Sequence, residues 1–152
     1  MPFNPAVDQE LAIDGMTYRV AEHPAAPGMP YGQEGRAAVV YQLLAPDSGM
    51  GALKVFKPRF RVPALVGLSD RIVSFAELPG LAVCRRTVLS ARRHANLLRQ
   101  YPDLTYTVLM PWVKGPTWTE VLVGRQKLSP EQSLELARSL AQCLFDDEQA
   151  MV

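Results

Sequence analysis

The hydrophobic positions near the start of the chain alternate with polar ones, as they do in β-strands. Residues 11–20 place apolar side chains on both sides of Asp14-Gly15, which predicts one or two short strands around a tight turn. Residues 23–30 hold three prolines and one glycine. Because proline lacks a backbone donor and glycine frees the backbone, we expect regular structure to be interrupted there.

Two continuous apolar runs and a helical pattern come next. Residues 37–44 and 51–56 are apolar with β-branched and aromatic members, and they flank the turn-forming residues 46–49. This arrangement predicts a β-hairpin. The apolar positions of residues 63–78 recur with helical spacing, and Pro79-Gly80 is a typical helix terminator.

Shorter signals occupy the middle of the chain. Residues 81–89 predict a strand, and residues 105–113 predict a second, strongly apolar one. Residues 91–99 are basic and fit either a short helix or a structured loop. Residues 117–123 follow a Gly-Pro pair and predict a short helix.

The clearest helix comes last, over residues 129–148. Ser129 can cap it, Pro130 occupies the first turn, where its missing N–H costs nothing, and Gln132 completes a capping box. Apolar side chains then form one face of the helix, at Leu134, Ala137, Leu140, Ala141 and Leu144. The order of elements predicts an α+β fold, with a twisted antiparallel sheet of about five strands, one packed helix and further helices after them.

Composition narrows the class of protein. The 152 residues are 48% hydrophobic and 20% charged, which argues against a disordered chain. A formal net charge of +1 gives no reason to expect nucleic acid or an acidic membrane as a partner. No apolar run approaches the roughly 18 residues of a membrane span, and the first residues do not read as a signal peptide. We therefore expect a cytoplasmic protein.

The segment from Tyr31 to Tyr41 resembles the glycine-rich loop of protein kinases, which runs G-x-G-x-x-G-x-V and folds a hairpin over the nucleotide phosphates. Backbone without side chains can approach phosphate oxygens and donate N–H groups to them. The comparison places Val40 on the valine, Gly35 on the second glycine and Ala38 on the third, whereas Gln33 replaces the first glycine. Gly32 lies beside it. A plain hairpin turn is the alternative interpretation.

Residues 51–56 resemble the V-A-I-K strand of the same family, with Lys54 at the lysine that contacts the α- and β-phosphates. In kinases a glutamate on the following helix pairs with this lysine. The resemblance implies Asp70 as the partner here, with Glu77 as the other acid available. Two alternatives stay open: Lys54 reaches solvent from an edge strand, or Asp70 is a solvated acid beside Arg71.

Residues 108–115 are similar to the fifth strand and hinge of a kinase. The resemblance implies that Met110 stands behind the adenine. It also implies that the carbonyl of Pro111 accepts from the adenine amino group and that the N–H of Val113 donates to a ring nitrogen. The small side chains of Val40 and Ala52 would cover the face of the base. The alternative is a buried strand that ends at a proline.

The resemblance covers about residues 15–150 and implies two parts. Residues 1–114 would form a kinase-like small lobe, and residues 115–152 would form the hinge exit and the first helices of a large lobe. ATP would be the cofactor, bound weakly by this chain, and Mg²⁺ would be held only in an intact parent that transfers the γ-phosphoryl group to a protein Ser/Thr. The sequence has no H-x-D or D-F-G motif, so we expect this chain alone to be catalytically inactive and to hold no metal ligands.

The same comparison implies the partners. They are ATP or another nucleotide, the missing large lobe and, through the apolar face of residues 129–148, a second copy of the chain. Two non-enzymatic alternatives remain. One is a pseudokinase-type lobe, which the loose glycine loop and Asp70 favour. The other is an unrelated α+β interaction module.

Overall fold

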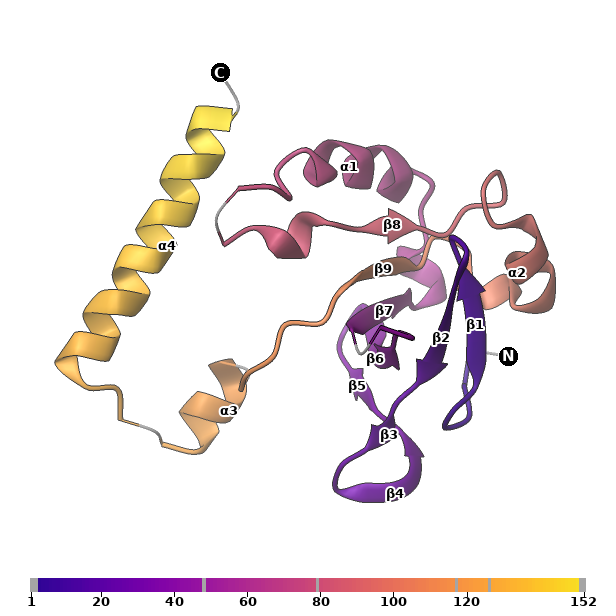
Figure 1. The fold of residues 1–152 in the computed structure, drawn as a ribbon, viewed down its shortest axis with the longest axis horizontal. Helices are drawn as coiled ribbons and strands as arrows, with labels where there is room; N and C mark the ends of the chain where they lie inside the picture. The colour runs from indigo at the N-terminus through magenta and orange to yellow at the C-terminus, as the bar shows by residue number, and fades with distance from the viewer. Residues whose placement is uncertain (1–2, 48, 79, 117, 126, 151–152) are drawn as a thin grey trace.

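In the computed structural model the chain folds as an α+β protein around one curled antiparallel sheet (Figure 1). The structure describes residues 3–47, 49–78, 80–116, 118–125 and 127–150, without the side chains at 118–119 and 143–150. The expected turn residue Ser48, the terminator Pro79, the helix start Thr117 and the side chain of Leu144 lie outside the described residues. Within the described part of the chain, no helix is long and apolar enough to cross a membrane.

The strands are short and pair with antiparallel neighbours throughout. They are β1 (Glu10–Ile13), β2 (Met16–Val20), β3 (Glu22–His23), β4 (Ala26–Pro30), β5 (Gly32–Glu34), β6 (Ala38–Leu44), β7 (Met50–Phe56), β8 (Thr87–Val88) and β9 (Val108–Pro111). Seven of them form one sheet in the order β1-β2-β6-β7-β9-β8, with β5 also paired to β6. The other two, β3 and β4, pair only with each other.

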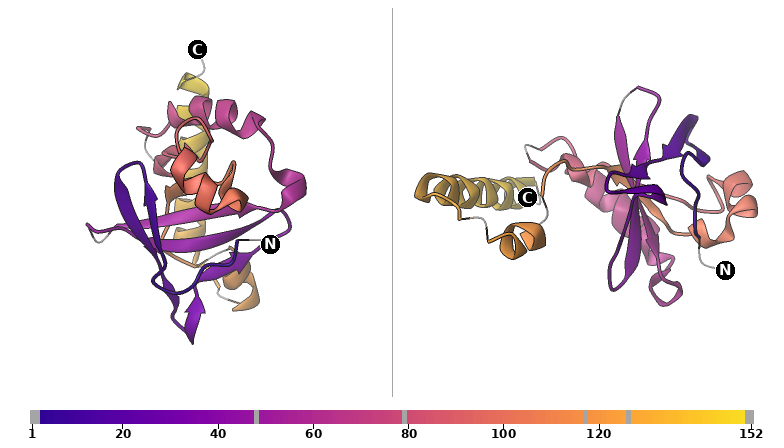
Figure 2. Two further views of the ribbon diagram at one scale, coloured as in Figure 1. Left: turned by 90° about the vertical axis from the view of Figure 1, so that its right-hand side faces the viewer. Right: turned by 90° about the horizontal axis from the view of Figure 1, so that it is seen from below.

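Helices connect these strands and continue beyond them. The α-helices are α1 (Ala64–Val73), α2 (Ala95–Gln100), α3 (Trp118–Val123) and α4 (Pro130–Ala150), and the 3-10 turns are η1 (Pro58–Phe60), η2 (Ala82–Cys84) and η3 (Pro102–Leu104). In two perpendicular views, α2 lies on one side of the sheet and α3 and α4 lie on the other (Figure 2). Helix α1 lies against β8.

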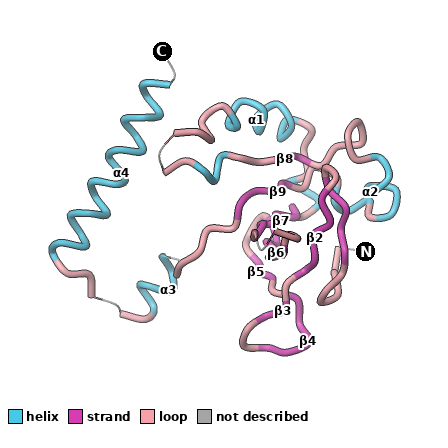
Figure 3. Tube along the Cα trace, viewed as in Figure 1, coloured by secondary structure: helices cyan, strands magenta, loops and turns pink. Residues whose placement is uncertain are grey.

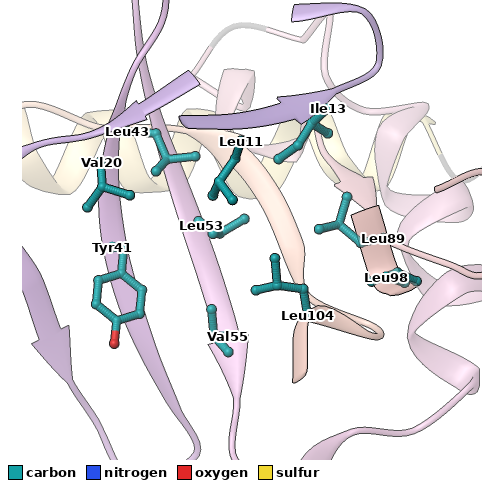
Figure 4. Close-up of a cluster of buried hydrophobic side chains, with 10 residues drawn as sticks. All are labelled: Leu11, Ile13, Val20, Tyr41, Leu43, Leu53, Val55, Leu89, Leu98 and Leu104. Carbon is teal, nitrogen blue, oxygen red and sulfur yellow. The ribbon is translucent and has the colours of Figure 1, made fainter. Parts of the chain in front are cut away.

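The core fills the side of the sheet that faces α2 (Figure 4). Tyr41 and Leu43 of β6 and Leu53 and Val55 of β7 project to this side and are buried. The β1–β2 hairpin and the segments around α2 close over them, with Leu11, Ile13, Val20, Leu89, Leu98 and Leu104. Full burial of such a side chain stabilises the fold by about 1.5–3 kcal/mol.

The structure confirms the two clearest turn and cap signals. Asp14 and Gly15 join β1 to β2 with φ of 50° and 81°, the pair of positive values that a type I′ hairpin turn requires. At α4, the N–H of Gln132 donates to Ser129 Oγ (3.2 Å), and the N–H of Ser129 donates to Gln132 Oε1 (2.9 Å). This reciprocal pair is the predicted capping box.

The expected interruption at residues 23–30 is wrong, because a second hairpin, β3–β4, occupies the segment (Figure 3). Both strands pair only with each other, so their outer edges need no donors, and edge strands tolerate proline. The expected sheet of about five strands is correspondingly too small. The β1–β2 hairpin extends the sheet to seven strands, and β3–β4 forms a separate pair.

Three expected elements are shorter than their patterns. Helix α1 ends at Val73, where the Ser74 hydroxyl donates to the carbonyl of Arg71 (2.7 Å) and competes with the helical pattern. Of the strand expected over 81–89, only Thr87 and Val88 pair with β9. The strand expected over 105–113 starts at Val108, because Tyr106 has a φ of 61° that no strand residue adopts.

Candidate functional site

The register of the sheet brings several predicted site residues onto one face. Val40 of β6 pairs with Lys54 of β7, and two residues further along Gln42 pairs with Ala52. Ala52 in turn pairs with Met110 of β9. Paired residues share a face and successive side chains alternate, so all five side chains project away from the core.

A pocket of about 590 Å³ lies on this face, between the sheet and the segment that follows β9. This volume is typical of small-molecule sites. Five of the predicted site residues line it: Val40, Ala52, Met110, Pro111 and Val113. Pro111 ends β9 and Val113 is 70% exposed in the irregular segment after it, so backbone of this segment lies at the pocket edge.

Lys54 lies beside the pocket, two residues along β7 from Ala52 and nearer to the β5–β6 turn. Its side chain is half-buried, and Nζ lies 5.3 Å from the centroid of the Phe56 ring. A cation near an aromatic ring is attracted to it, which holds the ammonium over the sheet face. Within the described part of the chain, Lys54 makes no ion pair with Asp70 or with Glu77, and Glu77 instead pairs with Arg85 (2.8 Å).

Asp70 takes a different place from the one the resemblance implies. It is exposed on α1 and lines a second pocket of about 740 Å³, which also holds Arg85 and Arg86. The two pockets adjoin, because both are lined by Met110 and Pro111. The structure therefore places Asp70 in the pocket on the other side of Met110 and Pro111, and among the described residues it shows no ion pair between Asp70 and Lys54.

The two glycines of the β5–β6 hairpin differ in what the fold demands of them. Gly32 faces the core side, where a Cβ would lie 2.9 Å from Cε1 of Tyr41. Gly35 closes the turn by donating its N–H to the carbonyl of Ala38 (2.8 Å), and a Cβ there would meet nothing closer than that oxygen at 3.5 Å. Packing thus explains Gly32, whereas the fold leaves residue 35 open to a side chain.

An ion pair ties this hairpin to the end of β7. Lys57 Nζ lies 2.7 Å from Oε1 of Glu34; Glu34 is exposed and Lys57 is partly exposed. The hydrogen bond from Lys57, followed by its positive charge, lowers the pKa of the Glu34 carboxyl. Lys57 lies on the side of the sheet that carries Tyr41 and Val55, so it is turned away from the pocket beside Lys54.

Sequence reasoning missed the other residues that line this pocket. Four of those that stand on or beside the sheet strands are Tyr31, Gln33, Gln42 and Trp112. Strand alternation alone could have found Gln42, which is two residues from Val40 on the same strand. Tyr31 precedes β5 and Trp112 follows β9, and only the pairing of β5, β6, β7 and β9 brings these distant segments together.

Comparison with known proteins assigns no family to this chain. No protein-family model matches it, and no match was found among curated proteins or solved structures. The strand order, the register and the pocket are therefore the observations from which a function can be inferred.

Proposed function

We propose that this chain is the nucleotide-binding small lobe of a protein-kinase-like protein, with ATP bound on the face of the sheet that carries Val40, Ala52 and Met110. An intact parent would transfer the γ-phosphoryl group of ATP to a protein Ser/Thr. The chain itself lacks the H-x-D and D-F-G motifs, so binding and positioning are the roles proposed for it.

The observation that carries the proposal is the position of Lys54. It pairs with Val40, which lines the pocket, and it lies at the end of the pocket nearer to the glycine-containing turn. A base held against Val40 and Ala52 would direct its phosphates along the sheet toward this ammonium. An ammonium is a compact charge that suits phosphate oxygens, and backbone N–H groups at the turn add to it.

The order of elements supports the same proposal. A glycine-containing hairpin, β5–β6, leads into the lysine strand β7, then into α1, β8 and finally β9 with the segment after it. The lysine strand lies between the hairpin and β9 in the sheet. Small side chains at Val40 and Ala52 leave room for a planar base, and the segment 111–113 offers backbone groups at its edge.

A non-catalytic, pseudokinase-type function is the second candidate, and one observation favours it. Lys54 and Asp70 form no ion pair, although active kinases require the lysine–acid pair to be in place. Such a lobe would bind nucleotide weakly and act through binding to other proteins. The expected homodimer through residues 129–148 stays a prediction, for which the exposed Leu134 and Leu140 of α4 are the side chains available.

Nucleotide titration of lysine variants tests the proposal. We expect Lys54→Met to lower the affinity for ATP about tenfold or more, because a charge-assisted phosphate contact contributes about 1.5–3 kcal/mol. Lys57→Met is the matched control: it makes the same change three residues on and toward the opposite side of the sheet. Isothermal titration calorimetry with ATP and Mg²⁺ on the whole chain measures both.

Two results would count against the proposal. If ATP does not bind the wild-type chain at millimolar concentration, the chain has no nucleotide site. If the wild type and Lys54→Met bind ATP with equal affinity, Lys54 does not contact the nucleotide. Thermal melts of both variants show whether the fold is retained. Lys57→Met should retain it, because the substitution removes only a surface ion pair that contributes about 0–1 kcal/mol.

A further inference from the structure

A stack of three aromatic rings joins the β3–β4 hairpin to the segment after β9. The ring centroids of His23 and Tyr31 are 5.0 Å apart, with the planes inclined at 72°. The centroids of Tyr31 and Trp112 are 5.4 Å apart, at 56°. Rings in these geometries attract each other beyond their burial. The stack thus links three parts of the chain that are distant in sequence.

Backbone hydrogen bonds hold the backbone of Tyr31 and Trp112, two members of the stack, against the sheet. The N–H of Tyr31 donates to the carbonyl of Ala21 (2.7 Å), and the carbonyl of Tyr31 accepts from the N–H of Gln42 (2.9 Å). The N–H of Trp112 donates to the carbonyl of Met50 (3.1 Å). The backbone of both residues is therefore anchored to the central sheet, which fixes the points from which the two rings project.

The His23 ring is oriented within the β3–β4 hairpin itself. Nδ1 of His23 accepts the N–H of Ala25 (3.1 Å), which sets the plane of the imidazole. Glu22 Oε1 accepts the N–H of Gly28 (2.6 Å), and Gly28 adopts a φ of 79° that glycine tolerates at no cost. The hairpin is thus a small preformed arm that presents His23 to Tyr31.

Tyr31 and Trp112 line the pocket on the Val40 face. All three rings are only partly buried, so the stack is not part of the main core on the other side of the sheet. Partly exposed aromatic rings at the edge of a concave pocket are suited to contact a planar ligand. Their position is at the β9 end of the pocket, opposite to Lys54.

We propose that Tyr31 and Trp112 form an aromatic wall that contacts the base of a purine nucleotide, and that His23 is a positioning residue which holds Tyr31 in place. This proposal rests on the proposed nucleotide-binding function and adds the side chains that contact the base. A two-ring base presents a larger π-face to such a wall than a one-ring base. The β3–β4 hairpin therefore belongs to the binding site.

Titration with ATP and CTP, which carry the same triphosphate, tests the wall. We expect the wild-type chain to bind ATP more tightly than CTP and Tyr31→Ala to lower the ATP affinity about tenfold, with a much smaller effect on CTP. Tyr31→Phe keeps the ring and should bind ATP as the wild type does. Lys54→Met should weaken both nucleotides alike and leave their affinity ratio unchanged.

The outcomes separate this proposal from the proposed function. A Tyr31→Ala variant that binds ATP as tightly as the wild type, while Lys54→Met binds it weakly, overturns the aromatic wall alone. A wild-type chain that binds neither nucleotide overturns both. If Tyr31→Ala does not fold, Trp112→Leu takes its place and the same loss of preference for ATP is expected.

The role of His23 has its own readout. The sequence has two tryptophans, so in a Trp118→Phe background the emission of Trp112 reports on the stack. We expect ATP to quench this emission, and His23→Ala to weaken ATP binding about threefold and shift the emission of the free chain. His23→Phe, which retains a ring, should restore both. If His23→Ala binds ATP as tightly as the wild type, the β3–β4 hairpin is not part of the binding site.

Discussion

At the scale of single residues, the two glycines of the β5–β6 hairpin are constrained differently. Packing against Tyr41 requires a glycine at position 32, whereas the fold leaves room for a side chain at position 35. Both stand in a segment that resembles a glycine-rich loop, and the sequence offers no way to tell them apart. Pairing with β6 turns Gly32 toward Tyr41, which is 8% exposed and lies edge-on against Phe3. Gly35 stands at the open turn.

We therefore expect Gly32→Ala to lower the free energy of unfolding by about 1–3 kcal/mol, the usual cost of overpacking, because the Tyr41 ring cannot move away from the new methyl group. Gly35→Ala is the control and should change stability by less than about 0.5 kcal/mol. Urea denaturation followed by circular dichroism measures both. Equal losses would show that the Tyr41 side of the hairpin is not close-packed.

Lys54 shows the limit of reasoning from one residue. The resemblance implies an acidic partner for it in Asp70, with a lysine that reaches solvent as the alternative. The structure leaves Lys54 half-buried over Phe56, with no ion pair to Asp70. The distance between Lys54 on β7 and Asp70 on α1 depends on the path of the connection through η1. The number of residues between them does not determine that path.

At the scale of elements, local signals were reliable where the local backbone alone satisfies them. The Asp14-Gly15 turn and the Ser129 capping box were both predicted and both form. Their hydrogen bonds and φ values involve residues within four positions of one another. In contrast, the interruption predicted over 23–30 was wrong, and only Thr87 and Val88 of the strand predicted over 81–89 form one. Pairing with a distant or edge strand decides whether such segments become β-structure.

Helix α4 depends on its cap more than a packed helix would. The described side chains at 131–142 are all exposed, so little tertiary packing supports the helix, and isolated helices are marginal in water. We expect Ser129→Ala to lower the stability of α4 by about 1 kcal/mol. Hydrogen exchange at the amides of its first two turns should rise about fivefold.

Ser133→Ala provides the matched control for this prediction. It makes the same chemical change four residues later, on an exposed position inside the helix, where alanine has the higher helix propensity. Exchange there should fall or stay the same. If Ser133→Ala raised exchange as much as Ser129→Ala, the reciprocal bonds of Ser129 and Gln132 would not be what holds the start of α4.

At the scale of the whole molecule, one buried histidine links the first hairpin to the middle of the chain. His94 is 6% exposed, and its Nδ1 accepts the N–H of Ser90 (3.2 Å). Its Nε2 is thus the donor to Oδ1 of Asp14, 3.1 Å away and 80 positions earlier. This bond joins the β1–β2 turn to the start of α2 over the core.

We expect His94→Leu to lower the free energy of unfolding by about 1–3 kcal/mol, because it leaves the N–H of Ser90 without its acceptor. Arg93→Ala is the control. Arg93 reaches the same carboxylate at 3.7 Å, but from an exposed position, where an ion pair contributes about 0–1 kcal/mol. Thermal and urea unfolding of the two variants would contradict this assignment if Arg93→Ala were the more costly.

The sequence by itself determined the class of fold, the hairpin of β6 and β7, the capped last helix and five of the residues that line the candidate pocket. These follow from side-chain periodicity and from turn and cap chemistry, which act over a few residues. Only the tertiary structure decided which residues share the pocket, that Gly32 belongs to the core side, that Lys54 and Asp70 stand apart, and that Tyr31 meets Trp112. Those outcomes depend on strand register and helix placement, which are set by contacts between residues far apart along the chain.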